Sequence, residues 1–240
     1  MAPPVLWHHA AVAEGRAELH SIVDDIMRAG GAGEESWPDP GLRASLHGLA
    51  ADDPQPITAG LSCLWASFIE YPNVFEPAVP AVRYVLALLD RKAGGDTVVR
   101  SPDGRLRPLR GHLLTWLAAA ADAVGDVRVR EFAELAGRSP LEHPGSAWHG
   151  VRLLRSRMYV AAAALLDDPD PGVRQEAIAA AVVLVRAPEL AAHRERIAAA
   201  ARAFLDACTD PQRRRWAEAA FRELSAATRT SAEPGVVRYR

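Results

Sequence analysis

The feature that most constrains this chain is a short pattern that recurs where helices should begin. An Asp, usually followed by Pro, precedes a spacer, an apolar residue and then Arg. Asp is a good N-cap because its carboxylate accepts hydrogen bonds from the first unpaired amides, and Pro is tolerated in the first turn. The apolar residue then starts a stripe that faces the core. Copies begin at Asp39, Asp53, Asp126, Asp170 and Asp210, and the clearest is Asp170-Pro171-Gly172-Val173-Arg174.

These copies resemble the HEAT-repeat family, in which antiparallel helix pairs of about 40 residues stack into an α-solenoid. The resemblance covers residues 39–226. Tyr71 to Val82 is also similar to the loop and second helix of certain actinobacterial HEAT-repeat proteins. The HEAT resemblance implies an all-α, armadillo-like fold. We expect one short α-solenoid of degenerate HEAT-like hairpins over residues 1–227, followed by a disordered tail over 228–240.

Apolar periodicity and cap residues together predict about ten helices. A small hairpin or loop insertion is expected at 92–108, since Pro102-Asp103-Gly104 is a plausible tight turn between short apolar runs. No sheet of more than two strands is expected, and any strand should lie within 96–107. A buried stripe is predicted at Val173, Ala177, Ala180, Ala181 and Leu184. The predicted helices are 12–29, 40–50, 54–70, 78–91, 109–124, 128–137, 147–167, 171–186, 188–208 and 211–227.

Composition agrees with a helical chain, because 49% of residues are hydrophobic but only 6% are aromatic. The net charge of −2 gives no general attraction to nucleic acid or anionic membrane. The charges are unevenly placed, however. Residues 1–90 carry 4 basic and 12 acidic residues, whereas residues 91–240 carry 24 and 18. We therefore expect an acidic end and a basic end.

No signal peptide or apolar run long enough to cross a membrane is recognisable, so a cytoplasmic protein is expected. Cys63 and Cys208 lie in apolar, helix-like segments and show no metal-ligand spacing. They are predicted to be buried, reduced thiols. The sequence predicts neither a metal site nor a cofactor.

Catalytic signals are weak. The carboxylate pairs, such as Asp24-Asp25 and Asp167-Asp168, lie near helix ends without a local His, Ser or Lys partner, which favours capping or solvation over acid–base chemistry. One enzymatic alternative is a small-molecule site where His112, Trp116 and Asp122 converge, although a histidine packed on a tryptophan explains the first two equally well. Another alternative is a HEAT-like protein that acts on nucleic acid, such as an alkylpurine DNA glycosylase.

The most informative segment is the helix expected at 147–167. Its residues Trp148, Arg152, Arg155 and Tyr159 recur at i, i+4, i+7 and i+11 and share one face. Aromatic and guanidinium groups are enriched in interface hot spots, so this strip is a candidate recognition surface. The alternative is architectural, with the aromatic rings covering a neighbouring helix.

The HEAT resemblance implies that the second helix of each pair lines the concave surface. It thereby places Arg83, His193 and Arg196 in the same groove as the strip, and the groove would be partly basic. The leading hypothesis is a non-enzymatic scaffold, regulator or immunity-type protein that binds a protein or peptide with an acidic surface. This hypothesis predicts that all four residues of the strip are exposed.

Overall fold

The computed structural model describes residues 5–31, 41–70, 73–91, 95–100, 104 and 106–209, together with the single residues 211, 214, 215, 218 and 222. Side chains of the first helix are described from Gly15 onward. Asp39 and Asp210, which open two of the pattern copies, lie outside the described residues. So does the tail at 228–240, and so does most of the helix predicted at 211–227.

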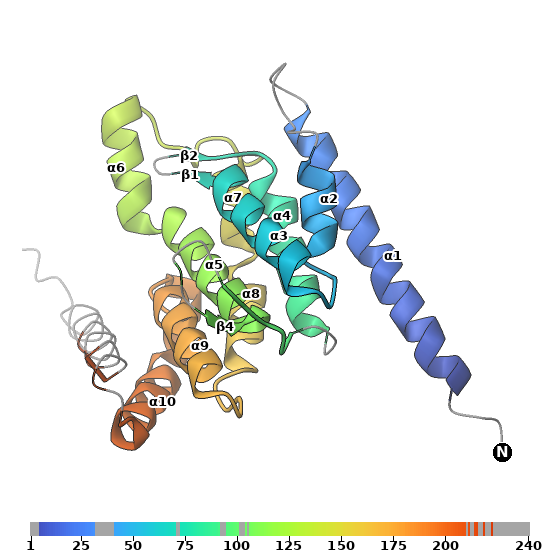
Figure 1. Cartoon of the computed structure of the whole chain (residues 1–240). Coiled ribbons are helices and arrows are strands. Elements are labelled where there is room, and N and C mark those ends of the chain that lie inside the picture. The colour runs from blue at the N-terminus through green and yellow to red at the C-terminus, as the bar shows by residue number, and fades with distance from the viewer. Residues whose placement is uncertain are drawn as a thin grey trace, which may run out of the picture.

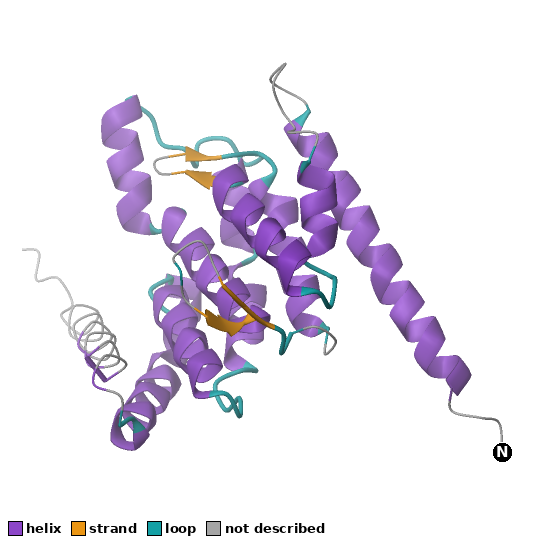
Figure 2. Cartoon of the chain, viewed as in Figure 1, coloured by secondary structure: helices purple, strands orange, loops and turns teal. Residues whose placement is uncertain are grey.

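The described part of the chain is all-α, as predicted, with two short hairpins (Figures 1 and 2). Most predicted helices appear within a few residues of their expected bounds. The elements in chain order are α1 (Val5–Gly30), α2 (Leu42–Gly48), α3 (Pro54–Ser67), β1 (Ile69–Glu70), β2 (Asn73–Val74), α4 (Ala78–Asp90), β3 (Val98–Arg100), β4 (Leu106–Pro108), α5 (Leu109–Ala123), α6 (Asp126–Ala136), α7 (Ala147–Leu153), α8 (Arg155–Ala163), α9 (Pro171–Leu184), the 3-10 helix η1 (Pro188–His193) and α10 (Arg194–Ala207).

Some details of the prediction are wrong. α1 begins seven residues before the expected start, and the helix expected at 188–208 begins as the 3-10 helix η1. The helix expected at 147–167 is divided at Leu154, whose amide bonds to the Val151 carbonyl at 3.0 Å, a tighter i to i−3 turn. Strands also occur outside 96–107. The antiparallel pair β1–β2 joins α3 to α4, and β4 extends to Pro108. Both sheets have only two strands, which agrees with the prediction for the described residues.

The helix starts follow the cap chemistry expected from the pattern. The Asp53 carboxylate accepts a hydrogen bond from the Gln55 amide, and that of Asp170 accepts from the amides of Gly172 and Val173. Asp126 is different, because Gly125 takes the N-cap position and makes no side-chain bond. The Asp126 carboxylate is therefore available for another partner.

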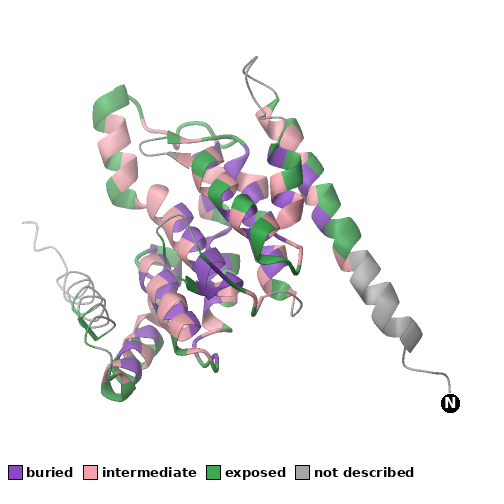
Figure 3. Cartoon of the chain, viewed as in Figure 1, coloured by how far each residue is buried: buried purple, intermediate pink, exposed green. Residues whose placement is uncertain are grey.

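The helices pack in pairs that are often distant in the chain. α2 packs along α3 and α8 along α9, whereas α5 packs most extensively on α9 and α1 on α4. The predicted stripe on α9 (Val173, Ala177, Ala180, Ala181 and Leu184) is fully buried against these neighbours, which confirms that prediction. In Figure 3 the buried positions gather on the inward faces of α4, α5 and α9. Stacking into a HEAT-type solenoid stays a prediction.

The β3–β4 hairpin covers one side of α5 and encloses a polar layer. Nε2 of the buried His112 donates to the Val99 carbonyl at 3.0 Å. Arg107 points inward from β4, and its guanidinium lies 2.5 Å from the Glu176 carboxylate on α9. Thr115 hydrogen-bonds to both members of this pair. The hairpin is thus attached to the helices through a buried ion pair.

A histidine pair joins α1 to α2. The rings of His20 and His47 lie with their centroids 4.4 Å apart, beside an ion pair between Asp24 and Arg43. Burial lowers the pKa of His47 from its ordinary value, and the neighbouring His20 and Arg43 lower it further. Protonation of His47 therefore opposes the docking of α1.

We expect the stability of the chain to fall on mild acidification. Because the folded state depresses the pKa of His47, the unfolded chain takes up that proton first as the pH drops below about 6.5. The contribution of His47 to the free energy of unfolding is therefore complete above about pH 6.5. It is lost as the pH falls from that value to the pKa of His47 in the folded chain. Urea unfolding at pH 7.5 and 5.5 measures the difference, which should be smaller in His47→Gln. An equal pH dependence in that variant would contradict the assignment.

Candidate functional site

The candidate site lies at the sharp corner between α5 and α6. Only Val124 and Gly125 separate the two helices, and the Gly125 amide bonds to the Asp122 carbonyl at 2.8 Å. A Cβ at position 125 would lie 2.9 Å from that same carbonyl oxygen, which is closer than backbone atoms tolerate. Glycine is therefore required for this approach. The corner brings the last turn of α5 beside the first turn of α6.

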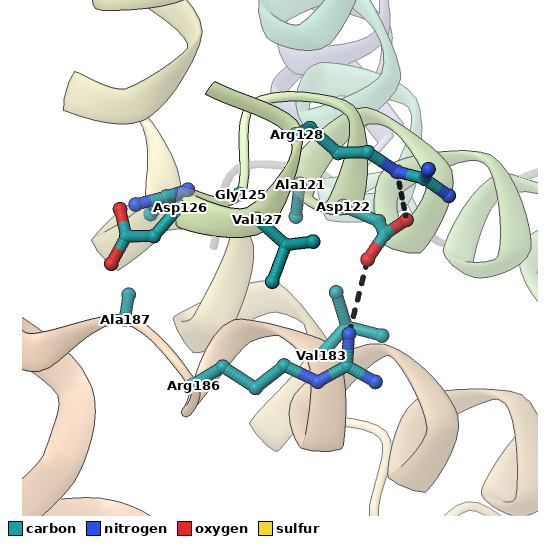
Figure 4. Close-up of a pocket in the computed structure, with 10 residues that line it drawn as sticks. Ala121, Asp122, Gly125, Asp126, Val127, Arg128, Val183, Arg186 and Ala187 are labelled. Carbon is teal, nitrogen blue, oxygen red and sulfur yellow. Dashed lines mark hydrogen bonds and ion pairs between the residues drawn. The ribbon is translucent and has the colours of Figure 1, made fainter. Parts of the chain in front are cut away.

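A pocket of about 210 Å³ opens at this corner (Figure 4). We call it the corner pocket. Its walls come from the end of α5, the start of α6, the first residue of α8 and the end of α9. Apolar side chains meet charged ones here, and the lining residues are Ala121, Asp122, Gly125, Asp126, Val127, Arg128, Arg155, Val183, Arg186 and Ala187.

Asp122 connects two arginines of the corner pocket. Its carboxylate lies 3.0 Å from the guanidinium of Arg186 and 3.5 Å from that of Arg128, as the dashed lines in Figure 4 show. Arg128 also pairs with Glu131 one turn along α6. The two guanidinium groups are thereby held in place on either side of one carboxylate, which favours a preorganised binding surface.

Two arginines from α7 and α8 brace the same corner. Arg155 donates from Nη2 to the Val124 carbonyl at 2.6 Å, and Glu189 lies 3.7 Å from its other terminal nitrogen. Arg152 forms an ion pair with Asp126. Burial lowers the pKa of Arg155, and the charge of Arg152 lowers it further. The corner therefore collects four arginines and their carboxylate partners.

The predicted exposure of the strip is wrong for three of its four residues. Trp148, Arg155 and Tyr159 are only 6%, 4% and 4% exposed, and Arg152 is half-buried. Trp148 packs against Phe132 of α6, with ring centroids 5.3 Å apart, while Tyr159 stacks on His193 at 4.3 Å. These contacts cover the aromatic rings, as the architectural alternative requires.

The remaining predicted groove residues do not gather at the corner. Arg83 on α4 and Arg196 on α10 are exposed, and His193 is half-buried beneath its stacking partner. Within the described part of the chain, no ion pair or hydrogen bond links Arg83 or Arg196 to the strip. A common concave groove for these residues stays a prediction.

The alternative small-molecule site does not assemble. His112 and Trp116 are both buried, and the Trp116 indole donates to the Leu64 carbonyl at 3.1 Å. Asp122 lies ten residues beyond His112 on the same helix, about 15 Å along its axis. Asp122 belongs to the corner pocket, so the prediction that these three residues converge is wrong.

The chemistry of the corner pocket suits recognition. None of its lining residues is Ser, Thr, Cys, His or Lys, and its two carboxylates, Asp122 and Asp126, are both paired with arginines. Three arginines and two carboxylates line it, and Glu131 and Glu189 beside it pair with Arg128 and Arg155. Among the described residues, no group of three or more His, Cys, Asp or Glu side chains is placed to hold a metal ion. A ligand carboxylate could share the guanidinium of Arg186, whose side chain is 42% exposed.

Large apolar side chains are exposed on the helices next to the corner pocket. Seven large hydrophobic side chains are exposed among the described residues, and four of them lie on α6, α7 and α8. Leu135 and Leu153 are 74% and 70% exposed, and Val127 and Val160 are the other two. No position on α6 is buried, and this helix projects from the end of α5 in Figure 1. Exposed apolar side chains beside ordered arginines are typical of interaction surfaces.

Sequence reasoning missed Gly125, Arg128 and Arg186 as site residues. A local signal existed for the first, because Asp126 is the one copy of the helix-start pattern that follows a glycine directly and lacks Pro. This combination predicts a helix that starts immediately after another ends. Arg186 reaches the site only through tertiary packing, and no local sequence pattern indicates it.

No protein-family model, no curated protein and no solved structure matches this chain. The HEAT resemblance therefore stays a hypothesis. Within the described residues, none of the helices combines the length and the apolar character that a membrane span requires.

Proposed function

We propose that this chain is a non-enzymatic, cytoplasmic, HEAT-like module that binds a protein partner over the corner between α5 and α6. The observation that carries the proposal is the coincidence of the corner pocket with the exposed apolar side chains of α6. The partner would cover Val127 and Leu135 and insert one carboxylate side chain into the corner pocket.

The charge pattern supports an acidic contact on the partner. Arg186 and Arg128 are ordered by Asp122, so little side-chain entropy is lost when a ligand carboxylate approaches them. Guanidinium groups bind carboxylates through paired hydrogen bonds, which gives the contact direction as well as strength. The surrounding apolar surface would exclude water from that contact.

Loss of the apolar contact should remove the partner without unfolding the chain. Leu135→Glu places a charge on an exposed helix position, where the folding stability should change by less than about 0.5 kcal/mol. Recovery of the partner from a lysate of the native host should fall at least about tenfold, since a buried apolar anchor contributes more than 1.4 kcal/mol. Quantitative mass spectrometry of pull-downs measures this change.

The matched control is Leu106→Glu, because Leu106 is similarly exposed on the distant β3–β4 hairpin. It should leave recovery unchanged. Arg186→Glu should reduce recovery as Leu135→Glu does. Equal recovery with all three variants would refute the proposed function.

A further inference from the structure

A second hollow lies at the opposite end of α5. The 15-residue helix places it about 20 Å from the corner pocket. It has a volume of about 290 Å³ and is lined by five leucines, Leu88, Leu89, Leu109, Leu113 and Leu165. We call it the leucine cavity. Its walls combine the end of α4, the first turns of α5 and the segment after α8.

Two arginines also line the leucine cavity, and they differ in their partners. Arg110 is held between the carboxylates of Asp96 and Asp168. Its Nε is buried and has no hydrogen-bond partner, a rare state that requires an explanation. Arg91 is half-buried, and its side chain forms no ion pair or hydrogen bond with any described residue. The apolar hollow thus contains one cation that has no counterion among the described residues.

Arg91 is the lining cation that is left for a ligand, because Arg110 is already paired with Asp96 and Asp168. A phosphate dianion would bring two negative charges to this single cation and would lie near the Asp96 carboxylate. A carboxylate matches the charge, and an aliphatic chain matches the leucines. The volume lies at the small end of the range for ligand pockets, about 300–1,000 Å³.

We propose that the leucine cavity binds a short aliphatic monocarboxylate of about six to eight carbons. The carboxylate pairs with Arg91, and the hydrocarbon chain packs against the leucines. This site is separate from the corner pocket and does not depend on the proposed protein partner.

Titration calorimetry with butanoate, hexanoate and octanoate tests the proposal on the full chain. Affinity should increase about fourfold for each methylene group that the cavity accommodates. Arg91→Gln should weaken octanoate binding at least about tenfold, because a charge-assisted hydrogen bond is lost. Binding of 1-octanol, the neutral analogue, should be the same in both proteins.

Arg83→Gln is the matched control, since Arg83 is an exposed arginine on α4, the helix that Arg91 follows, and lies outside the cavity lining. Octanoate should bind this variant as it binds the original chain. A second variant, Ala50→Leu, adds bulk to the cavity wall and should reduce octanoate affinity even if Arg91→Gln folds poorly. The proposal is overturned if octanoate does not bind at millimolar concentration. It is also overturned if chain length has no effect, or if Arg91→Gln and Arg83→Gln bind equally.

Discussion

Replacing Arg107 with methionine should lower the free energy of unfolding by about 3–5 kcal/mol, because it leaves the Glu176 carboxylate buried without its cation. The two side chains are only 8% and 14% exposed, so water cannot replace the lost partner. Among the described residues, Thr115 would then be the remaining hydrogen-bond partner of Glu176. Denaturant unfolding monitored by circular dichroism measures the change.

The control for this prediction is the double variant Arg107→Met/Glu176→Leu. Removing both charges from a buried pair is often nearly neutral, so most of the stability lost in the single variant should return. Additive losses in the double variant would show that the pair is solvated, and the described packing of the hairpin on α9 would be wrong.

Replacing Leu184 with alanine should cost about 2–5 kcal/mol, since the residue is buried in the stripe that joins α9 to α5. Leu153→Ala is the matched control. Leu153 is exposed, and its truncation should change the free energy of unfolding by less than about 0.5 kcal/mol. If the two variants lose similar stability, the buried and exposed faces have been assigned incorrectly.

Much of the helical fold was predictable because its signals are local. Asp53 and Asp170 make the cap hydrogen bonds that their positions before Pro predict. The stripe from Val173 to Leu184 is buried as its spacing requires. The β1–β2 pair was not predictable in the same way, because two strands of two residues each are too short to show alternation.

The predicted exposure of the strip is wrong for a different reason. Spacing correctly identifies Trp148, Arg152, Arg155 and Tyr159 as one face, but it cannot say what covers that face. α7 and α8 contact both α4 and α5, and α8 also packs on α9, so more than one face of this segment is enclosed. The aromatic rings then gain more by burial against Phe132 and His193 than they would by facing water.

The corner pocket depends on residues far apart in the chain. Asp122 and Arg186 are 64 positions apart and meet only because α5 packs along α9. Arg152 and Arg155 were selected by spacing and do reach this corner, although they brace its backbone and its Asp126 carboxylate. The helical spacing therefore identified two residues near the corner pocket, but the exposure predicted for the strip was wrong.

Site-specific photo-crosslinking in the native host tests the proposed interaction most directly. A benzophenone amino acid at position 135 should give one discrete crosslinked product with a protein partner, and the same group at position 106 should give none. Arg186→Glu should reduce the yield of the product from position 135. Absence of a product at position 135, or an equal product at both positions, would contradict the proposal that the corner between α5 and α6 is the binding surface of this chain.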